Sequence, residues 1–204
     1  MKIKSIIFSL ILCLICFSRA GDIFADVKIG NQAPDFALTD TYGQRHALSE
    51  YRGNFVVLEW VNHGCPFVVK HYGSKNMQKL QKKYGEKGVV WFSVCSSAPG
   101  KQGHFNADVW NDITERKEAA PHAVLIDENG IVGRLYGAQT TPHMFIIDPA
   151  GDLIYMGAID SIPSTNPEDI EKADNYVKMA LDEAMAGKPV NTKSTKAYGC
   201  SVKY

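Results

Sequence analysis

Continuous apolar runs alternate along the chain with segments that have helical periodicity. The runs at 54–61 (NFVVLEWV) and 89–94 (VVWFSV) have the length and composition of strands buried on both faces of a sheet. Between these runs, Met77, Leu80 and Tyr84 give a helix one apolar face. A helix that joins two buried strands predicts a β–α–β unit with parallel strands.

Further elements are expected on both sides of this unit. Residues 36–38 and 46–48 flank the turn-rich segment TDTYGQR and predict an N-terminal β-hairpin. A helix near 106–119 should precede a third buried strand, AVLID, at 123–127. Near Gly73, the helix of the β–α–β unit is expected to bend.

A second hairpin and a long helix complete the pattern. The turn DPAGD separates the strands MFIID and LIYMG. Asn166 is predicted to cap the last helix, Pro167 to begin it and Gly187 to end it. Its buried stripe is expected to be Ile170, Ala173, Val177, Ala180, Leu181 and Ala184. The order of elements predicts an α/β sandwich with a mixed central sheet.

The N-terminus has the layout of a secretory signal. Lys2 and Lys4 precede an apolar stretch at 6–17, and Ala20 and Ala25 are candidate cleavage points. We interpret residues 1–25 as a signal peptide, with a retained membrane anchor as the alternative. An exported protein would be periplasmic or extracellular.

Signal removal would leave residues 26–204 as one domain, with a flexible-looking tail at 188–204. Cys13 and Cys16 would leave with the signal. The formal net charge is zero and there is no basic run, so electrostatics favour neither nucleic acid nor an anionic membrane as a partner.

Three cysteines remain after processing: Cys65, Cys95 and Cys200. An odd number in an oxidising compartment allows at most one internal disulfide and leaves one thiol over. This small number favours redox chemistry over a disulfide-stabilised scaffold.

The pair Cys65–Pro66 stands where a buried strand ends and a helix begins. Proline is favoured at the first position of a helix, and ligands gather at this edge of an α/β sheet. The free N–H groups and dipole of the helix favour a reactive thiolate, and a protonated His63 could add to this effect. An inert cysteine that only caps the helix is the alternative.

Thr141 and Pro142 open the strand MFIID. If their peptide bond is cis, the turn would direct the backbone toward the Cys65 site. A trans proline that begins an ordinary strand is equally compatible with these residues.

The segments VVLEWVNHGCPFV and TPHMFIIDPAGDLIYMG resemble the thioredoxin-like superfamily. More closely, CPFVVKHY, SSAPGKQGH, TTPHMFIIDP and YGCSVKY resemble a secreted bacterial subgroup of redoxins of the alkyl hydroperoxide reductase/thiol-specific antioxidant (AhpC/TSA) family. The similarity covers the chain from about Gly30 to Tyr204. It implies a thioredoxin-like fold, Cys65 as nucleophile, and Pro142 as a cis-proline preceded by Thr141.

Two departures from these families bear on the chemistry. Val68 stands where a dithiol motif has its second cysteine. Leu58 and Asn62 replace the proline and the hydroxyl residue that precede the peroxidatic cysteine of peroxiredoxins. Neither resolution within the motif nor orientation of a peroxide by that hydroxyl is therefore expected.

We predict an exported thiol–disulfide oxidoreductase that needs no cofactor. Cys65 would attack protein or small-molecule disulfides, Cys200 would resolve the mixed disulfide, and an unidentified thiol donor would supply electrons. A peroxidase that forms a sulfenic acid at Cys65 is one alternative. A non-catalytic binding module on the same fold is another, and Cys200 could instead be an unpaired or intermolecular thiol.

Other residues are weaker candidates. Cys95 is expected in the core, although it could face Cys65 from the next strand. A copper or zinc site formed by Cys65, His143 and Cys200 is conceivable, without specific spacing. Glu59 is either a buried carboxylate and proton relay or a side chain at the exposed end of the sheet. The segment SSAPGKQGH (96–104) is interpreted as a loop at the rim of the site.

Overall fold

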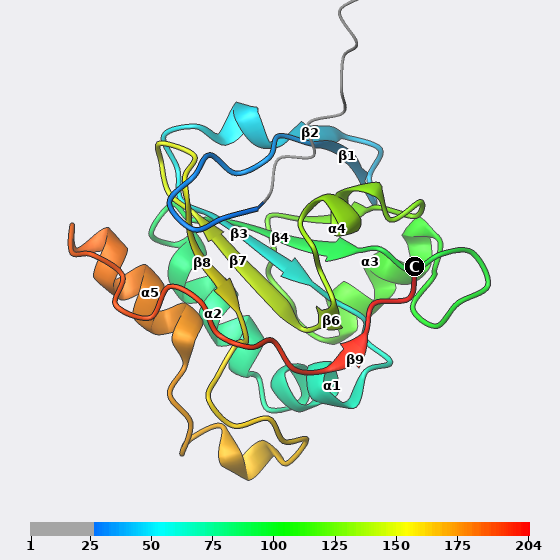
Figure 1. Cartoon of the computed structure of the whole chain (residues 1–204). Coiled ribbons are helices and arrows are strands. Elements are labelled where there is room, and N and C mark those ends of the chain that lie inside the picture. Colours follow the sequence, from blue (N-terminus) through cyan, green and yellow to red (C-terminus); the bar gives the residue numbers. More distant parts are fainter. Residues whose placement is uncertain (1–26) are drawn as a thin grey trace, which may run out of the picture.

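A computed structural model describes residues 27–204, and the predicted signal peptide with Cys13 and Cys16 lies outside them. A seven-stranded sheet with the strand order β2-β1-β5-β4-β3-β7-β8 forms the centre of the domain (Figure 1). The strands are β1 Ala37–Asp40, β2 Arg45–Ala47, β3 Val56–Trp60, β4 Val90–Cys95, β5 Ala123–Ile126, β7 His143–Ile147 and β8 Leu153–Gly157.

The sheet is mixed, as the sequence pattern predicts. Strands β3, β4 and β5 are parallel, and the other neighbouring strands are antiparallel. Strands β1 and β2 form the expected N-terminal hairpin, and β7 and β8 form the second hairpin. The two hairpins therefore flank three parallel strands, and the chain that leaves one of these strands, β3, leads to the candidate site at Cys65.

Helices and apolar side chains cover both faces of the sheet. The helices are α1 Pro66–Gly73, α2 Asn76–Gly85, α3 Ala107–Arg116, α4 Ile131–Leu135 and α5 Tyr176–Met185, with short 3₁₀ turns at η1 Leu48–Tyr51 and η2 Pro167–Asp169. Alternate residues of β3 enter different clusters: Val57 packs with residues of α1, α2 and α5, and Leu58 packs with residues of α4. Within residues 27–204, no helix is both long and apolar enough to cross a bilayer.

The break between α1 and α2 confirms the expected bend near Gly73. Helix α1 ends at Gly73, and α2 begins at Asn76 after Lys75, which has a left-handed conformation (φ 61°). Asn106 caps α3 at the predicted position, although that helix ends at Arg116 instead of Ala119.

The predicted start of the last helix is wrong. Asn166 caps only the short turn η2, whereas α5 begins at Tyr176. The intervening chain bonds back to the loop after β8, because Ser161 N donates to Asp174 O (3.0 Å) and Tyr176 N donates to Ile159 O (3.0 Å). These backbone contacts separate the turn η2 from helix α5. Of the predicted stripe, the residues buried in α5 are Val177, Ala180 and Leu181.

The tail at 188–204 is fastened along its length. It first follows β8, where Met156 N donates to Lys193 O and Thr195 N donates to Met156 O (both 3.1 Å). Strand β9 Cys200–Ser201 then pairs antiparallel with β6 Thr140–Thr141 (Figure 1). A segment that looks flexible in sequence thus forms a second, two-stranded sheet directly before Pro142.

The two asparagine caps give a test of the helix boundary. Asn175 accepts a hydrogen bond from Lys178 N (2.8 Å), so Asn175→Ala should lower the free energy of unfolding by about 1 kcal/mol. Asn166→Ala should cost clearly less, because its side chain caps only a three-residue turn. Urea unfolding of both variants measures this, and equal losses would contradict the boundary at Asn175.

Candidate active site

Cys65 lies in the connection between β3 and α1, as predicted. It is the N-cap residue of α1, and Pro66 occupies the first helical position. Asn62 shapes the preceding turn: its side-chain oxygen accepts from Gly64 N and its carbonyl accepts from Cys65 N (both 2.9 Å). The thiol of Cys65 is completely buried.

Two backbone groups from distant segments contact the sulfur of Cys65. The thiol donates to Thr141 O (3.0 Å), and Cys200 N donates to Cys65 Sγ (3.4 Å). The peptide bond between Thr141 and Pro142 is cis, as the family resemblance implied. Thr141 and Cys200 are direct partners in the pairing of β6 with β9. The fold therefore brings Cys65, Thr141, Pro142 and Cys200 together, and the two sulfurs are not bonded.

The two thiols have opposite pKa shifts. Burial alone would raise the pKa of Cys65, but hydrogen bonds from the Cys200 thiol and from the N–H groups of Val68 and Cys200 outweigh it, so this pKa lies below its ordinary value. Burial and the neighbouring Cys65 raise the pKa of Cys200 to about 11. Cys65 is thus the thiol that ionises first, while Cys200 keeps its proton and donates it in a hydrogen bond.

His63 does not supply the positive charge that a protonated ring could have added. Its ring packs against Tyr72 (centroids 4.6 Å apart) and Trp110 (5.4 Å). Burial, with a contribution from the charge of Lys117, lowers the pKa of His63 to about 3. The imidazole is therefore neutral at neutral pH, and hydrogen bonds instead of a cation at this position stabilise the thiolate.

Glu59 is a completely buried carboxylate in the middle of β3, which excludes the position at an exposed sheet end. Burial raises the pKa of Glu59 to about 7, although four hydrogen bonds oppose the shift. The donors are Trp91 Nε1 (2.8 Å), Tyr72 OH (2.9 Å), Gln81 Nε2 (3.3 Å) and Ser93 Oγ (3.5 Å). A buried acid with a pKa near neutrality can take up or release a proton beneath α1.

Cys95 is buried at the end of β4, and its thiol donates to Gly103 O (3.4 Å). Burial raises the pKa of Cys95, which suits an inert core thiol. The loop at 96–104 also contacts the turn before Cys65, because Asn62 Nδ2 donates to Gln102 O (3.1 Å). This contact places the loop at the rim of the site, as predicted.

His143 does not join the thiols in a metal site. Its Nδ1 accepts a hydrogen bond from Gln139 N (3.3 Å), and burial lowers its pKa to about 4. Across residues 27–204, no group of three His, Cys, Asp or Glu side chains is arranged to hold a metal ion.

Sequence reasoning missed the role of Gly199, although its place beside Cys200 was a signal. Gly199 has φ +146°, and a Cβ at this position would lie 2.1 Å from Thr141 O. Only glycine therefore lets the tail approach the backbone before Pro142 so closely. This approach brings Cys200 against Cys65.

Comparison with known proteins shows the family to which the chain belongs. The sequence profile of the Redoxin family matches residues 28–177, and the chain belongs to this family. The thiol-disulfide oxidoreductase ResA of Bacillus thuringiensis subsp. konkukian is 27% identical over 162 residues, which cover 76% of this chain and 88% of that protein.

Solved structures show the same fold. A hypothetical protein from Sinorhizobium meliloti superposes with a TM-score of 0.73 at 23% identity, over 88% of this chain and 96% of that one. A putative thiol:disulfide interchange protein DsbE from Chlorobium tepidum superposes with a TM-score of 0.52 at 27% identity, over 64% and 85% of the two chains. The α/β fold is therefore thioredoxin-like, and the distant relatives include thiol–disulfide oxidoreductases.

Gly199→Ala tests whether the close approach of the tail covers Cys65. The added Cβ would collide with Thr141 O, and the positive φ would cost on the order of 1–3 kcal/mol. We expect the tail to detach and iodoacetamide to alkylate Cys65 roughly tenfold or more faster, as followed by mass spectrometry. An unchanged rate would show that the tail does not limit access to the sulfur.

Glu59→Gln tests the protonation of the buried carboxylate. The pKa of Glu59 rises from 4.5 to about 7 on folding, so the folded protein holds this proton more tightly. Relative to the variant, the wild type should lose roughly 3 kcal/mol of unfolding free energy as pH rises from about 4 to about 8. Urea unfolding of the wild type and the variant at both pH values measures the difference in unfolding free energy between them. The histidines titrate in both proteins and therefore do not contribute to this difference. A difference that stays constant with pH would contradict the shift.

Proposed function

We propose that this chain is an exported thiol–disulfide oxidoreductase in which Cys65 attacks a disulfide and Cys200 resolves the product. One observation carries the proposal: the backbone N–H of Cys200 donates to the sulfur of Cys65, on a strand that pairs with the residue before Pro142. The relationship to thiol-disulfide oxidoreductases of the ResA type supports the same chemistry. The position of the second thiol in the tail compensates for Val68 in the motif.

In the first step, the thiolate of Cys65 attacks one sulfur of a substrate disulfide. A bond forms between Cys65 and that sulfur, the substrate S–S bond breaks, and the other substrate sulfur leaves as a thiolate that takes up a proton. The lowered pKa of Cys65 increases the fraction of this thiol that is present as the attacking thiolate.

In the second step, Cys200 loses its proton and attacks the sulfur of Cys65. The Cys65–Cys200 disulfide forms, the second substrate thiolate leaves, and the substrate has gained two electrons. The proton that Cys200 releases passes to the solvent that reaches this partly exposed thiol. An external thiol donor then reduces the Cys65–Cys200 disulfide by two exchange reactions and returns both thiols.

The sequence layout at 1–25 supports export to the periplasm or the exterior, where disulfide substrates occur. The substrates we propose are protein or small-molecule disulfides, and the reaction uses no cofactor.

A peroxidase is the second candidate, because complete burial of Cys65 favours a small oxidant. A peroxide would oxidise Cys65 to a sulfenic acid with release of water or an alcohol, and Cys200 would then condense with it and release water. Asn62 stands where a peroxiredoxin has the hydroxyl that orients the peroxide, which places this activity second.

Cysteine variants separate these functions in an insulin-reduction assay with dithiothreitol as the thiol donor. Cys65→Ser should abolish turnover, whereas reduced Cys200→Ser, mixed with insulin after the dithiothreitol has been removed, should accumulate a mixed disulfide between Cys65 and the substrate, visible by mass spectrometry. Cys95→Ala is the matched control and should retain activity, because burial raises the pKa of that thiol and its proton is donated to Gly103 O.

Two results would reject the proposal. Rapid consumption of peroxide without insulin reduction would identify a peroxidase. Failure of Cys65 to react with any disulfide at neutral pH would leave a binding module on a redox fold.

A further inference from the structure

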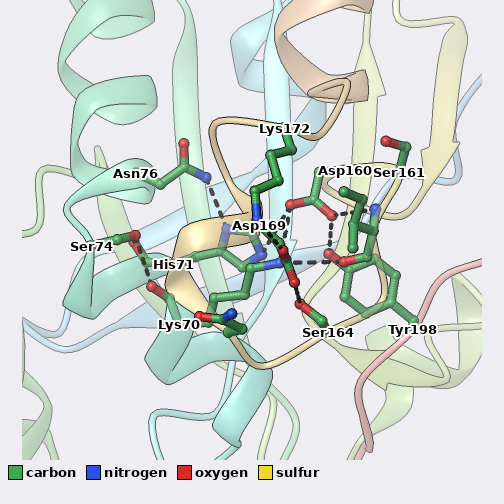
Figure 2. A network of polar contacts seen from close by, with 12 residues as sticks. Lys70, His71, Ser74, Asn76, Asp160, Ser161, Ser164, Asp169, Lys172 and Tyr198 are labelled. Carbon is green, nitrogen blue, oxygen red and sulfur yellow. Dashed lines mark hydrogen bonds and ion pairs between the residues drawn. The ribbon is translucent and has the colours of Figure 1, made fainter.

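A buried polar cluster lies between α1 and the tail, outside the reacting thiols (Figure 2). Asp160, in the loop after β8, is its centre. Lys70 Nζ lies 3.4 Å from Asp160 Oδ2, and His71 Nε2 lies 3.8 Å from the same oxygen. Tyr198 OH and Ile162 N (3.1 Å) both donate to Asp160 Oδ1.

The centre of the cluster is a buried ion pair beside a neutral imidazole. The side chains of Lys70 and Asp160 have exposed fractions of 0% and 2%. His71 Nδ1 is hydrogen-bonded to Asn76 Nδ2 (2.9 Å), and burial lowers the pKa of His71 to about 4, so the ring is neutral. A buried ion pair costs desolvation energy and is weak evidence for stabilisation alone. The role of this pair is therefore sought in the segments that it connects.

Asp160 connects the helix that carries Cys65 to the segment that carries Cys200. Lys70 lies on α1, whose N-cap is Cys65. Tyr198 precedes Cys200 by two positions, and its ring also packs against Phe67 of α1 (centroids 5.6 Å apart). The hydroxyl and ring of Tyr198 thus fix the tail to α1 just before the close approach at Gly199.

The tail is also held after Cys200. Ala98 N donates to Lys203 O (2.8 Å), and Tyr204 OH donates to Ala138 O (2.7 Å). Arg134 lies over the ring of Tyr204, 4.3 Å from its centroid. Cys200 is therefore held between two anchors, and the Tyr198 anchor contacts α1 directly through Phe67 and indirectly through Asp160 and Lys70.

We propose that Asp160 and Tyr198 are positioning residues that hold Cys200 against Cys65. This inference rests on the proposed function, in which Cys200 resolves the mixed disulfide formed at Cys65. The anchor has two consequences that oppose each other. It raises the effective concentration of the resolving thiol, which accelerates disulfide closure. It also keeps the tail over Cys65 and so slows attack on external disulfides.

Tyr198→Phe tests the proposal because it removes only the hydroxyl bound to Asp160. We expect roughly tenfold faster alkylation of Cys65 by iodoacetamide in the reduced protein, and roughly tenfold slower closure of the Cys65–Cys200 disulfide with oxidised glutathione. Quenched samples analysed by mass spectrometry give both rates. Faster alkylation together with slower disulfide closure identifies Tyr198 as a positioning residue. Loss of a residue that only supports the fold would not change the two rates in opposite directions.

Tyr84→Phe is the matched control. Its hydroxyl donates to the carboxylate of Asp182 (2.9 Å), between α2 and α5 and away from the tail. This variant loses a comparable hydrogen bond and should leave both rates unchanged. Phe67→Leu, which removes the ring contact with Tyr198, is a second test and should shift both rates in the same directions as Tyr198→Phe, by less.

Cys95 serves as an internal control for general loosening, because it is buried in the core in the same molecule. Unchanged rates in Tyr198→Phe would overturn the proposal, as would alkylation of Cys95 in parallel with Cys65. The alkylation measurement needs no redox turnover. A wild-type protein that never forms the Cys65–Cys200 disulfide would reject the proposed function, and the alkylation rates would still decide whether Tyr198 holds the tail over Cys65.

Discussion

The antiparallel pairing of the tail with the residues before Pro142 determines what Cys65 can do. Thr141 and Cys200 are partners in this pairing, and each contributes one backbone group to the sulfur. The same pairing therefore buries Cys65, places the Cys200 N–H, which favours the thiolate, against the sulfur, and brings a second thiol beside it. The close approach at Gly199 is the steric condition for this arrangement. Access to Cys65 and the ionisation of its thiol depend on this one piece of backbone geometry, and so does the resolution step that we propose.

The electrostatics of the site follow from burial and hydrogen bonding. Burial alone would keep Cys65 protonated, and the neutral ring of His63 offers no charge to oppose it. Donors from the helix N-terminus and from Cys200 reverse the balance. Burial raises the pKa of Glu59, which is bonded to Tyr72 of α1, to about 7. Lys70 and Asp160 form an ion pair that is shielded from solvent. The site thus combines a thiol whose pKa is lowered, a buried carboxylate whose pKa is raised, and an ion pair that is bonded to Tyr198 of the tail.

The sequence predicts the local features well, because short stretches of the chain determine them. Apolar runs locate the central strands, and Cys65–Pro66 locates the start of α1. Asn166 misled the prediction of the last helix, since Asn175 carries the same capping side chain and backbone contacts with the loop after β8 select between them. Contacts between distant segments, such as Tyr198 with Asp160, have no periodic signature and become visible only in the fold.

The central claim is that Cys65 and Cys200 act as one redox pair. Disulfide mapping by mass spectrometry, before and after a brief oxidant pulse and after re-reduction, tests it most directly. Our account predicts a Cys65–Cys200 disulfide that forms and is reduced reversibly, with Cys95 remaining a free thiol throughout. Oxidation that leaves Cys65 unmodified, or that links Cys200 only to a second molecule, would contradict it.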